Sequence, residues 1–259
     1  MAPGWSERRA AWGIAVRLLT LNVCHTGMER AKRLAPVVLN GLPDIAVLTE
    51  VRPGPATEHL LELMALGGMS AAARGATDAD DLPYTLAIAS RRPLDAVRRP
   101  FVGTRYGCAV LEVEVSGVII VGLYVPLNRS SPRRRDHDGF WEAFAPYAAG
   151  VLERPAVLVG DWNTGSAALD IGGSAVPGMA AFDALAASGW TDAWRSRHPG
   201  VSEYSWHNPG SGNGFRLDHA LLSRPLAPAL RDAAYRHETR ARGMSDHAAL
   251  AVEFDPGMA

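Results

Sequence analysis

The stretch Gly243-Met244-Ser245-Asp246-His247 precedes the apolar run Ala248–Phe254 near the end of this 259-residue chain. The apolar run predicts a buried strand. Asp246 and His247 would then stand at the edge of a sheet, where a carboxylate and an imidazole can serve a metal ion or a substrate. A turn capped by Ser245 and Asp246 explains the same residues. The pair becomes informative when other strands end in residues of similar chemistry.

The bulk composition describes an ordinary globular chain, with 47% hydrophobic and 20% charged residues. The net charge of −1 means that any nucleic-acid binding needs a local basic face. No apolar run is long enough to cross a membrane. Two cysteines are too few for a disulfide framework and indicate a reducing compartment. We expect a cytoplasmic monomer with no membrane partner, in which 1–14 form a loose lead-in and 15–259 form a single domain.

The hydrophobic pattern predicts an antiparallel-rich α/β fold with helices on the outside. Strands are expected at 16–22, 44–49, 84–89, 108–115, 118–125, 156–159, 204–207, 215–222 and 248–254. Helices are expected at 28–40, at 57–66 with Thr57 as its cap, from Pro132 onward, and at 178–188. Residues 77–81 are expected to form a turn. The second strand is expected to end at Glu50.

Most of these strands end in, or contain, a polar residue with a carboxylate, amide, phenol or imidazole side chain. A carboxylate in an apolar run is costly unless it is paired or bound to a cation. If the ends converge at one sheet edge, Mg²⁺ or Mn²⁺ would relieve their repulsion. No Cys/His spacing of the zinc type is present. The polar residues are Asn22, Glu50, Tyr124, Asp161, Asn163, Asp218, Asp246 and His247.

Six short motifs built on these residues resemble the endonuclease/exonuclease/phosphatase superfamily in order and rough spacing. They are Leu-Thr-Leu-Asn22, Leu-Thr-Glu50, Tyr124-Val-Pro, Gly-Asp161-Trp-Asn163, Arg216-Leu-Asp218 and Ser-Asp246-His247. The resemblance covers the chain from about residue 16 onward. It implies a four-layer α/β/β/α sandwich of two mostly antiparallel sheets, and a metal-dependent phosphoesterase.

The C-terminal third is most similar to exonuclease III-type apurinic/apyrimidinic (AP) endonucleases. The matching segments are 189–199, 204–206 and 214–218. The resemblance implies that Trp206, Phe215 and Leu217 wall an apolar pocket for a baseless sugar. The alternative is that these three side chains are strand core.

Three departures from the repair enzymes keep the substrate open. Cys24 stands where the family usually carries a second carboxylate or amide, Val51-Arg52 follows Glu50, and Tyr84 begins a segment without the usual Gly-Val-Ala pattern. A phosphatase or phosphodiesterase acting on a small molecule or lipid headgroup is therefore the alternative function. A binding module without catalysis is a third.

Basic residues cluster after Tyr124, at Arg129, Arg133, Arg134 and Arg135. The resemblance implies that they contact the backbone of abasic or intact duplex DNA. A solvated helix N-terminus explains the same residues, although arginines there are unfavourable to the helix dipole.

The resemblance also implies roles at the site. Glu50, Asn22 and Asp246 would bind Mg²⁺, with Mn²⁺ as the other candidate. His247, oriented by Asp218, would hold a phosphate oxygen or deprotonate water, and Asp161 is the other candidate base. Asn163 would position the phosphate or the attacking water, and Tyr124 would hydrogen-bond a phosphate oxygen as charge builds. The choice between Asp161 and His247 as base stays open.

Overall fold

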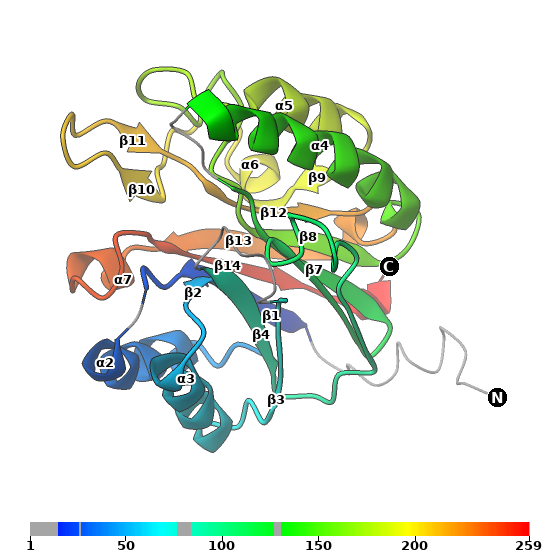
Figure 1. The fold of residues 1–259 in the computed structure, drawn as a ribbon. Helices are drawn as coiled ribbons and strands as arrows, with labels where there is room; N and C mark the ends of the chain where they lie inside the picture. Colours follow the sequence, from blue (N-terminus) through cyan, green and yellow to red (C-terminus); the bar gives the residue numbers. More distant parts are fainter. Residues whose placement is uncertain (1–14, 26, 77–83, 127–130, 259) are drawn as a thin grey trace.

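The computed structural model describes residues 15–25, 27–76, 84–126 and 131–258, without the side chains of 131–136 and 258. Within these ranges two six-stranded sheets pack face to face, and helices cover the outer face of each (Figure 1). The predicted four-layer α/β/β/α sandwich is confirmed. The expected lead-in at 1–14 and the expected turn at 77–81 lie outside the described residues.

The first sheet has the strand order β13-β14-β1-β2-β4-β3. The neighbours β1 and β2 are parallel, and the other pairs are antiparallel. Its strands are β1 Val16–Asn22, β2 Ile45–Val51, β3 Ala71–Arg74, β4 Thr85–Ser90, β13 Leu230–Arg236 and β14 Ala249–Phe254. The helices α2 Met28–Leu39 and α3 Pro55–Leu66 cover its outer face.

The second sheet has the strand order β5-β6-β7-β8-β12-β9, with β7 and β8 parallel. Its strands are β5 Ala96–Arg98, β6 Val110–Val115, β7 Val118–Tyr124, β8 Ala156–Asp161, β9 Thr191–Asp192 and β12 Asp218–Leu222. The helices α4 Ser131–Val151 and α5 Met179–Ala187 cover its outer face. Helix α4 buries Phe140, Trp141 and Phe144 against this sheet.

Shorter elements complete the described chain. They are the hairpin strands β10 Trp206–His207 and β11 Gly214–Phe215, the helices α6 Ala193–Arg197 and α7 Glu238–Ala241, and the 3₁₀ turns η1 Ala227–Ala229 and η2 Pro256–Met258. No helix in the described ranges is long and apolar enough to cross a membrane. Cys24 and Cys108 are free thiols.

The central strands are apolar on both faces because both faces are buried. In β1, Val16 and Leu18 pack against the second sheet, while Leu19 and Leu21 pack under the helices. Strands buried in this way appear as continuous apolar runs rather than alternating ones. This is why the sequence pattern located them.

Several boundaries differ from the sequence-based expectation. Strand β2 continues through Glu50 to Val51, and its register with β4 shifts there. Helix α3 begins at Pro55 with Gly54 as its cap, because proline suits the first helical position; the Thr57 hydroxyl instead donates to the Arg52 carbonyl at 2.7 Å. The strand expected at 215–222 is split between β11 and β12. Of the strand expected at 204–207, the last two residues alone form β10.

Candidate active site

Polar strand ends from both sheets meet at one edge of the sandwich. In the second sheet the register places Tyr124 beside Asp161, and Asp161 beside Asp218. Two hydrogen bonds join this row to the first sheet. Asn22 Nδ2 donates to Asp161 Oδ2 at 2.9 Å, and the Tyr124 hydroxyl donates to Glu50 Oε1 at 3.0 Å. The structure therefore brings together strand ends that are far apart in the sequence.

The backbone at this edge adopts conformations that non-glycine residues rarely take. Cys24, His25, Glu50 and Asn163 have φ of 49°, 53°, 53° and 50°. Such residues cost about 1–3 kcal/mol each and cluster at functional sites. At Glu50 the left-handed residue coincides with the register shift of β2, a β-bulge that re-aims the side chain.

Gly160 is the residue that lets Asp161 reach its place in the row. Its φ is 149°, and a Cβ there would lie 1.9 Å from the Leu123 carbonyl oxygen on β7. Because this neighbour is backbone, it cannot rotate away. Only glycine allows β7 and β8 to approach closely at this point.

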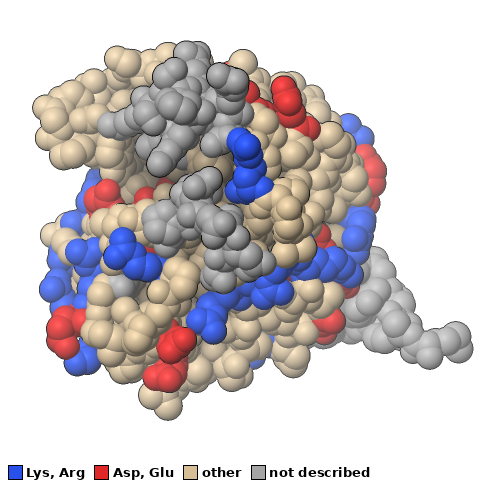
Figure 2. All heavy atoms as spheres, in the orientation of Figure 1, with Lys and Arg blue, Asp and Glu red and all other residues tan. Residues whose placement is uncertain are grey.

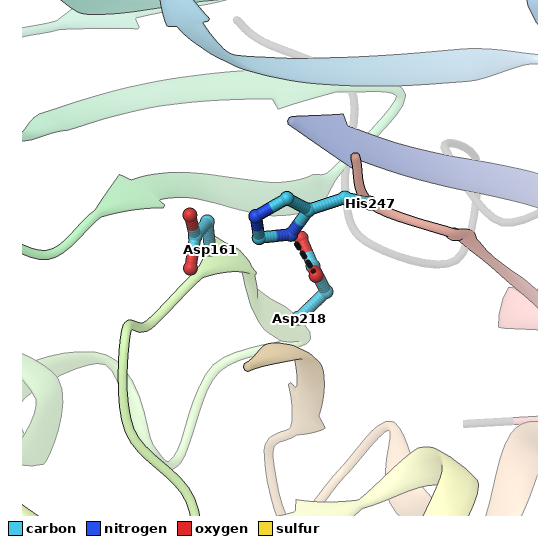
Figure 3. A group of neighbouring side chains, drawn as sticks. All are labelled: Asp161, Asp218 and His247. Atoms are coloured by element: carbon cyan, nitrogen blue, oxygen red, sulfur yellow. Dashed lines mark hydrogen bonds and ion pairs between the residues drawn. The ribbon is translucent and has the colours of Figure 1, made fainter. Parts of the chain in front are cut away.

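Asp218 and His247 form a buried acid–imidazole pair. His247 Nδ1 lies 2.7 Å from Asp218 Oδ2. Figure 3 shows the imidazole between the carboxylates of Asp218 and Asp161. Burial opposes the charged imidazole, but Asp218, with support from Asp161 and Asp246, raises the pKa of His247 to about 10. His247 is therefore a cation at neutral pH.

The environment favours the charged form of His247, but it favours the uncharged form of Asp161. Burial, and next the charge of Asp218, raise the pKa of Asp161 to about 7. Its oxygens accept hydrogen bonds from the Asn22 amide and from the backbone N–H of Asn163, the latter at 2.9 Å. A carboxyl group with a near-neutral pKa can accept or release a proton at working pH.

The three predicted metal ligands surround the loop that follows β1. Glu50 Oε2 lies 3.1 Å from His25 Nδ1, and the Cys24 thiol hydrogen-bonds the Asp246 carboxylate. Asn22 Oδ1 accepts from the backbone N–H of Cys24 at 2.9 Å. Residues of one short loop therefore contact all three predicted ligands.

A pocket that is partly open to solvent lies at this edge. Trp206 links its polar and apolar sides: its ring centroid is 5.7 Å from that of Phe215, and its Nε1 donates to Asp246 Oδ2 at 2.9 Å. The three predicted wall residues line this pocket as well as packing in the fold. The lining residues are Glu50, Asn163, Val176, Trp206, Phe215, Leu217, Asp246 and His247.

The donor atoms at this edge fit a hard divalent cation. Carboxylate oxygens of Asp161 and Asp218 and a ring nitrogen of His247 all lie within 4.8 Å of one another, and the two carboxylates supply the oxygen donors. Asp218 Oδ1 is buried and has no hydrogen-bond partner among the described residues. A buried carboxylate oxygen is costly unless a proton or cation satisfies it. With Glu50 and Asp246 nearby in the pocket, the set is rich in oxygen donors.

Arg216 anchors the pocket wall from behind. Its guanidinium donates to Asp170 at 2.7 and 2.8 Å and to Asp192 at 2.7 Å. Although burial opposes ionisation, Arg216 holds the pKa values of Asp170 and Asp192 below their usual range. Because Phe215 and Leu217 flank Arg216, this network fixes both wall residues and interrupts the expected strand at 215–222.

Some residues predicted to bind the substrate lie outside the described part of the structure, and two residues at the site were not predicted from the sequence. Arg129 and the side chains of Arg133, Arg134 and Arg135 lie outside the described part of the structure. On the face seen in Figure 2, Lys and Arg side chains run in a band despite the near-neutral net charge. Val176 lies in a loop without a motif. His25 was not predicted either. The one signal for it in the sequence is its neighbour Cys24, which departs from the family pattern.

Comparison with known proteins identifies the family of this chain. Residues 19–247 match the Endonuclease/Exonuclease/phosphatase family. The chain belongs to this family, and the resemblance carried by the six sequence motifs is confirmed.

Several relatives in this family are nucleases by name. The chain is 27% identical over 165 residues to an exodeoxyribonuclease of Streptococcus pneumoniae, covering 56% of this chain and 58% of that protein. It is 26% identical over 160 residues to the DNA repair nuclease APEX1 of Danio rerio, covering 55% and 51%. The matches thus span about half the length of these relatives.

Solved structures share the whole architecture. The 3′ phosphatase NExo from Neisseria, bound to a product DNA hairpin, aligns with a TM-score of 0.79 and 25% identity over 93% of this chain and 99% of that chain. An AP endonuclease from Archaeoglobus fulgidus aligns with a TM-score of 0.79 and 20% identity over the same shares. The second likeness concerns the fold alone.

Proposed function

We propose that this protein is a divalent-metal-dependent phosphodiesterase that hydrolyses the DNA backbone, as an AP endonuclease or 3′–5′ exonuclease. One observation carries the proposal: a single pocket is lined by His247 and carboxylates on one side and by aromatic and aliphatic walls on the other. This combination suits a phosphate attached to a sugar that has lost its base. The nuclease names of the relatives support the same substrate class.

Glu50, Asp246 and Asn22 would hold the ion, with Mg²⁺ as the first candidate and Mn²⁺ as the second. When bound, the ion polarises a phosphoryl oxygen and offsets the charge that develops on it. Asn22 would also hold the Asp161 carboxylate in place, because its side-chain amide donates a hydrogen bond to that carboxylate.

We assign the proton acceptor to Asp161 and the cationic phosphate contact to His247. The near-neutral pKa of Asp161 suits a base that removes a proton from water. The raised pKa of His247 keeps its imidazole charged, so it donates to a non-bridging phosphate oxygen while Asp218 orients the ring. These pKa directions support Asp161 as the base and His247 as the phosphate contact.

Tyr124 and Asn163 would complete the phosphate site. Burial and the nearby Glu50 carboxylate raise the pKa of Tyr124, so its hydroxyl stays protonated. Its one hydrogen, which Glu50 accepts in the structure, would turn to a phosphate oxygen once a cation holds Glu50. Asn163 lines the pocket, and its side-chain amide is fixed by donation to the Val125 carbonyl at 2.8 Å. Both groups are thus oriented before a substrate arrives.

The second candidate function is hydrolysis of a small phosphoester or lipid headgroup. Cys24 at an accessory metal position and the net charge of −1 favour it. The apolar walls Trp206, Phe215 and Leu217, and the arginines Arg129, Arg133 and Arg134 as backbone contacts, favour DNA.

A panel of substrates separates these functions. The protein, with Mg²⁺, is incubated with duplex DNA bearing one abasic site, with intact duplex, and with phosphomonoesters and small phosphodiesters. We expect strand incision at the abasic site or removal of nucleotides from a 3′ end. Turnover of the small esters alone would favour the second candidate. Absence of turnover on every substrate would favour a non-catalytic binding module.

The pH–rate profile is expected to be bell-shaped, with activity between about pH 7 and about pH 10. Below the pKa of Asp161, which burial raises to about 7, the base is protonated and kcat/KM falls. Above the His247 pKa of about 10, the imidazole loses its charge and kcat/KM falls again. A bound cation favours the ionised carboxylate, so the acid limb should move to lower pH as metal concentration rises.

The profile is measured as kcat/KM from about pH 5 to about pH 11 at two fixed metal concentrations. An acid limb that does not respond to metal concentration, or activity that is flat from about pH 5 to about pH 8, contradicts the assignment of Asp161.

A further inference from the structure

Cys24 and His25 follow β1, and each reaches a carboxylate proposed to hold the metal ion. The Cys24 thiol hydrogen-bonds Asp246, and His25 Nδ1 lies 3.1 Å from Glu50 Oε2. Two consecutive left-handed residues, with φ of 49° and 53°, give the loop this course. Such a conformation persists only where surrounding contacts, or a ligand, require it.

The imidazole of His25 is held in place before any ion binds. It stacks on Tyr84 with ring centroids 4.0 Å apart and planes 9° apart. Arg52 Nη2 donates to the Tyr84 hydroxyl at 3.1 Å, and its guanidinium carbon lies 5.3 Å from the centre of that ring. The His25 and Glu50 side chains are 38% and 20% exposed, so an ion from solvent can reach the pair.

We propose that His25 is a nitrogen ligand of the metal ion, sharing it with Glu50; this inference rests on the proposed metal-dependent function. Adjacent ligands of an octahedral ion at about 2.1 Å lie about 3 Å from one another. The 3.1 Å between His25 Nδ1 and Glu50 Oε2 matches that separation. Side chains and backbone are therefore arranged as a nitrogen–oxygen ligand pair.

An ordinary His–Glu ion pair explains less of the geometry. Partly exposed ion pairs contribute little to stability, and here the pair joins two segments that both have strained backbone. His59 and Glu62 on α3 form an ordinary pair, with Nδ1 3.6 Å from the carboxylate on an unstrained helix. That pair provides a matched control within the same chain.

A nitrogen ligand changes which ion the site prefers. Mg²⁺ favours oxygen donors, whereas imidazole suits ions of the transition series. The His25–Glu50 pair is therefore expected to select Mn²⁺ over Mg²⁺. A site made of Glu50, Asp246 and Asn22 alone would give less discrimination, because its donors are all oxygen.

Pulsed electron paramagnetic resonance of the full chain loaded with Mn²⁺ detects directly bound nitrogen through its ¹⁴N coupling. We expect this coupling in the wild type and in His59→Gln, and its loss in His25→Gln. Glutamine can still donate a hydrogen bond to Glu50 but offers no imidazole. A His25 that only hydrogen-bonds Glu50 would therefore leave the spectrum unchanged in this variant.

Calorimetric titration with Mn²⁺ and with Mg²⁺ gives the second readout. His25→Gln is expected to lower the ratio of Mn²⁺ to Mg²⁺ affinity about tenfold, and His59→Gln to leave it unchanged. Nitrogen coupling that persists in His25→Gln, or Mn²⁺ affinity that stays equal or rises, overturns the inference while the proposed function stands. A wild-type chain that binds neither ion overturns both.

Discussion

Asp161→Asn is expected to lower kcat on a cleavable DNA substrate by about 10⁴-fold, the upper range for loss of a general base. Asparagine keeps the size of the side chain and one oxygen that can accept from either the Asn22 amide or the Asn163 N–H, but it cannot take up a proton. The rate of the chemical step is measured under single-turnover conditions, so that product release does not mask the loss.

The same variant is expected to fold as stably as the wild type or more so. Asp161 and Asp218 are neighbouring buried carboxylates, and neutralising one removes their repulsion. Asp183→Asn, at an exposed position on α5, is the matched control and should change neither rate nor stability. A rate for Asp161→Asn within tenfold of the wild type would remove Asp161 from the mechanism.

Arg216→Ala is expected to lower the free energy of unfolding by about 3–5 kcal/mol, because it removes the buried guanidinium that Asp170 and Asp192 share. Asp170 would keep its ion pair with Arg195, and Asp192 its contacts with His219 and the Arg195 backbone N–H. The measurement is denaturant unfolding at neutral pH. Activity should fall as well, since the wall residues Phe215 and Leu217 flank Arg216. Arg224→Ala removes an exposed pair with Glu153 and should cost at most about 1 kcal/mol.

The contribution of Arg216 to the free energy of unfolding is expected to depend on pH. Arg216 holds the pKa values of Asp170 and Asp192 below their unfolded values. The stabilisation is therefore present above the unfolded pKa of about 4 and is lost as pH falls through the folded pKa values. The difference in stability between wild type and Arg216→Ala should shrink progressively below about pH 4. Equal losses from Arg216→Ala and Arg224→Ala at neutral pH would contradict the role of the buried network.

The sandwich could be predicted because its central strands are buried on both faces. Strands β1, β2 and β8 are near-continuous apolar runs, and the helical spacing of α2 and α4 is equally clear. Edge elements lack this signal. Strand β13 contains Arg231, Asp232 and two alanines with mixed burial, so only its pairing with β14 identifies it. Strand β9 has two residues, too few for any periodicity.

The site could be predicted in part for a related reason. A polar residue such as Asp161 at the end of an apolar run is costly, so its presence points to chemistry. The bulge at Glu50 and the left-handed backbone at His25 could not be predicted, because they depend on register and on contacts across the fold. Val176 enters the pocket from a loop whose course local sequence does not specify.

The most direct test follows incision of an end-labelled duplex that carries one abasic site, with Mg²⁺, with excess chelator, and with Asp161→Asn in place of the wild type. The proposed function predicts one cut at the abasic site with the metal, none after chelation, and a rate about 10⁴-fold lower for Asp161→Asn. Incision that survives chelation, or that proceeds equally in Asp161→Asn, would contradict a metal-dependent phosphodiesterase centred on this pocket.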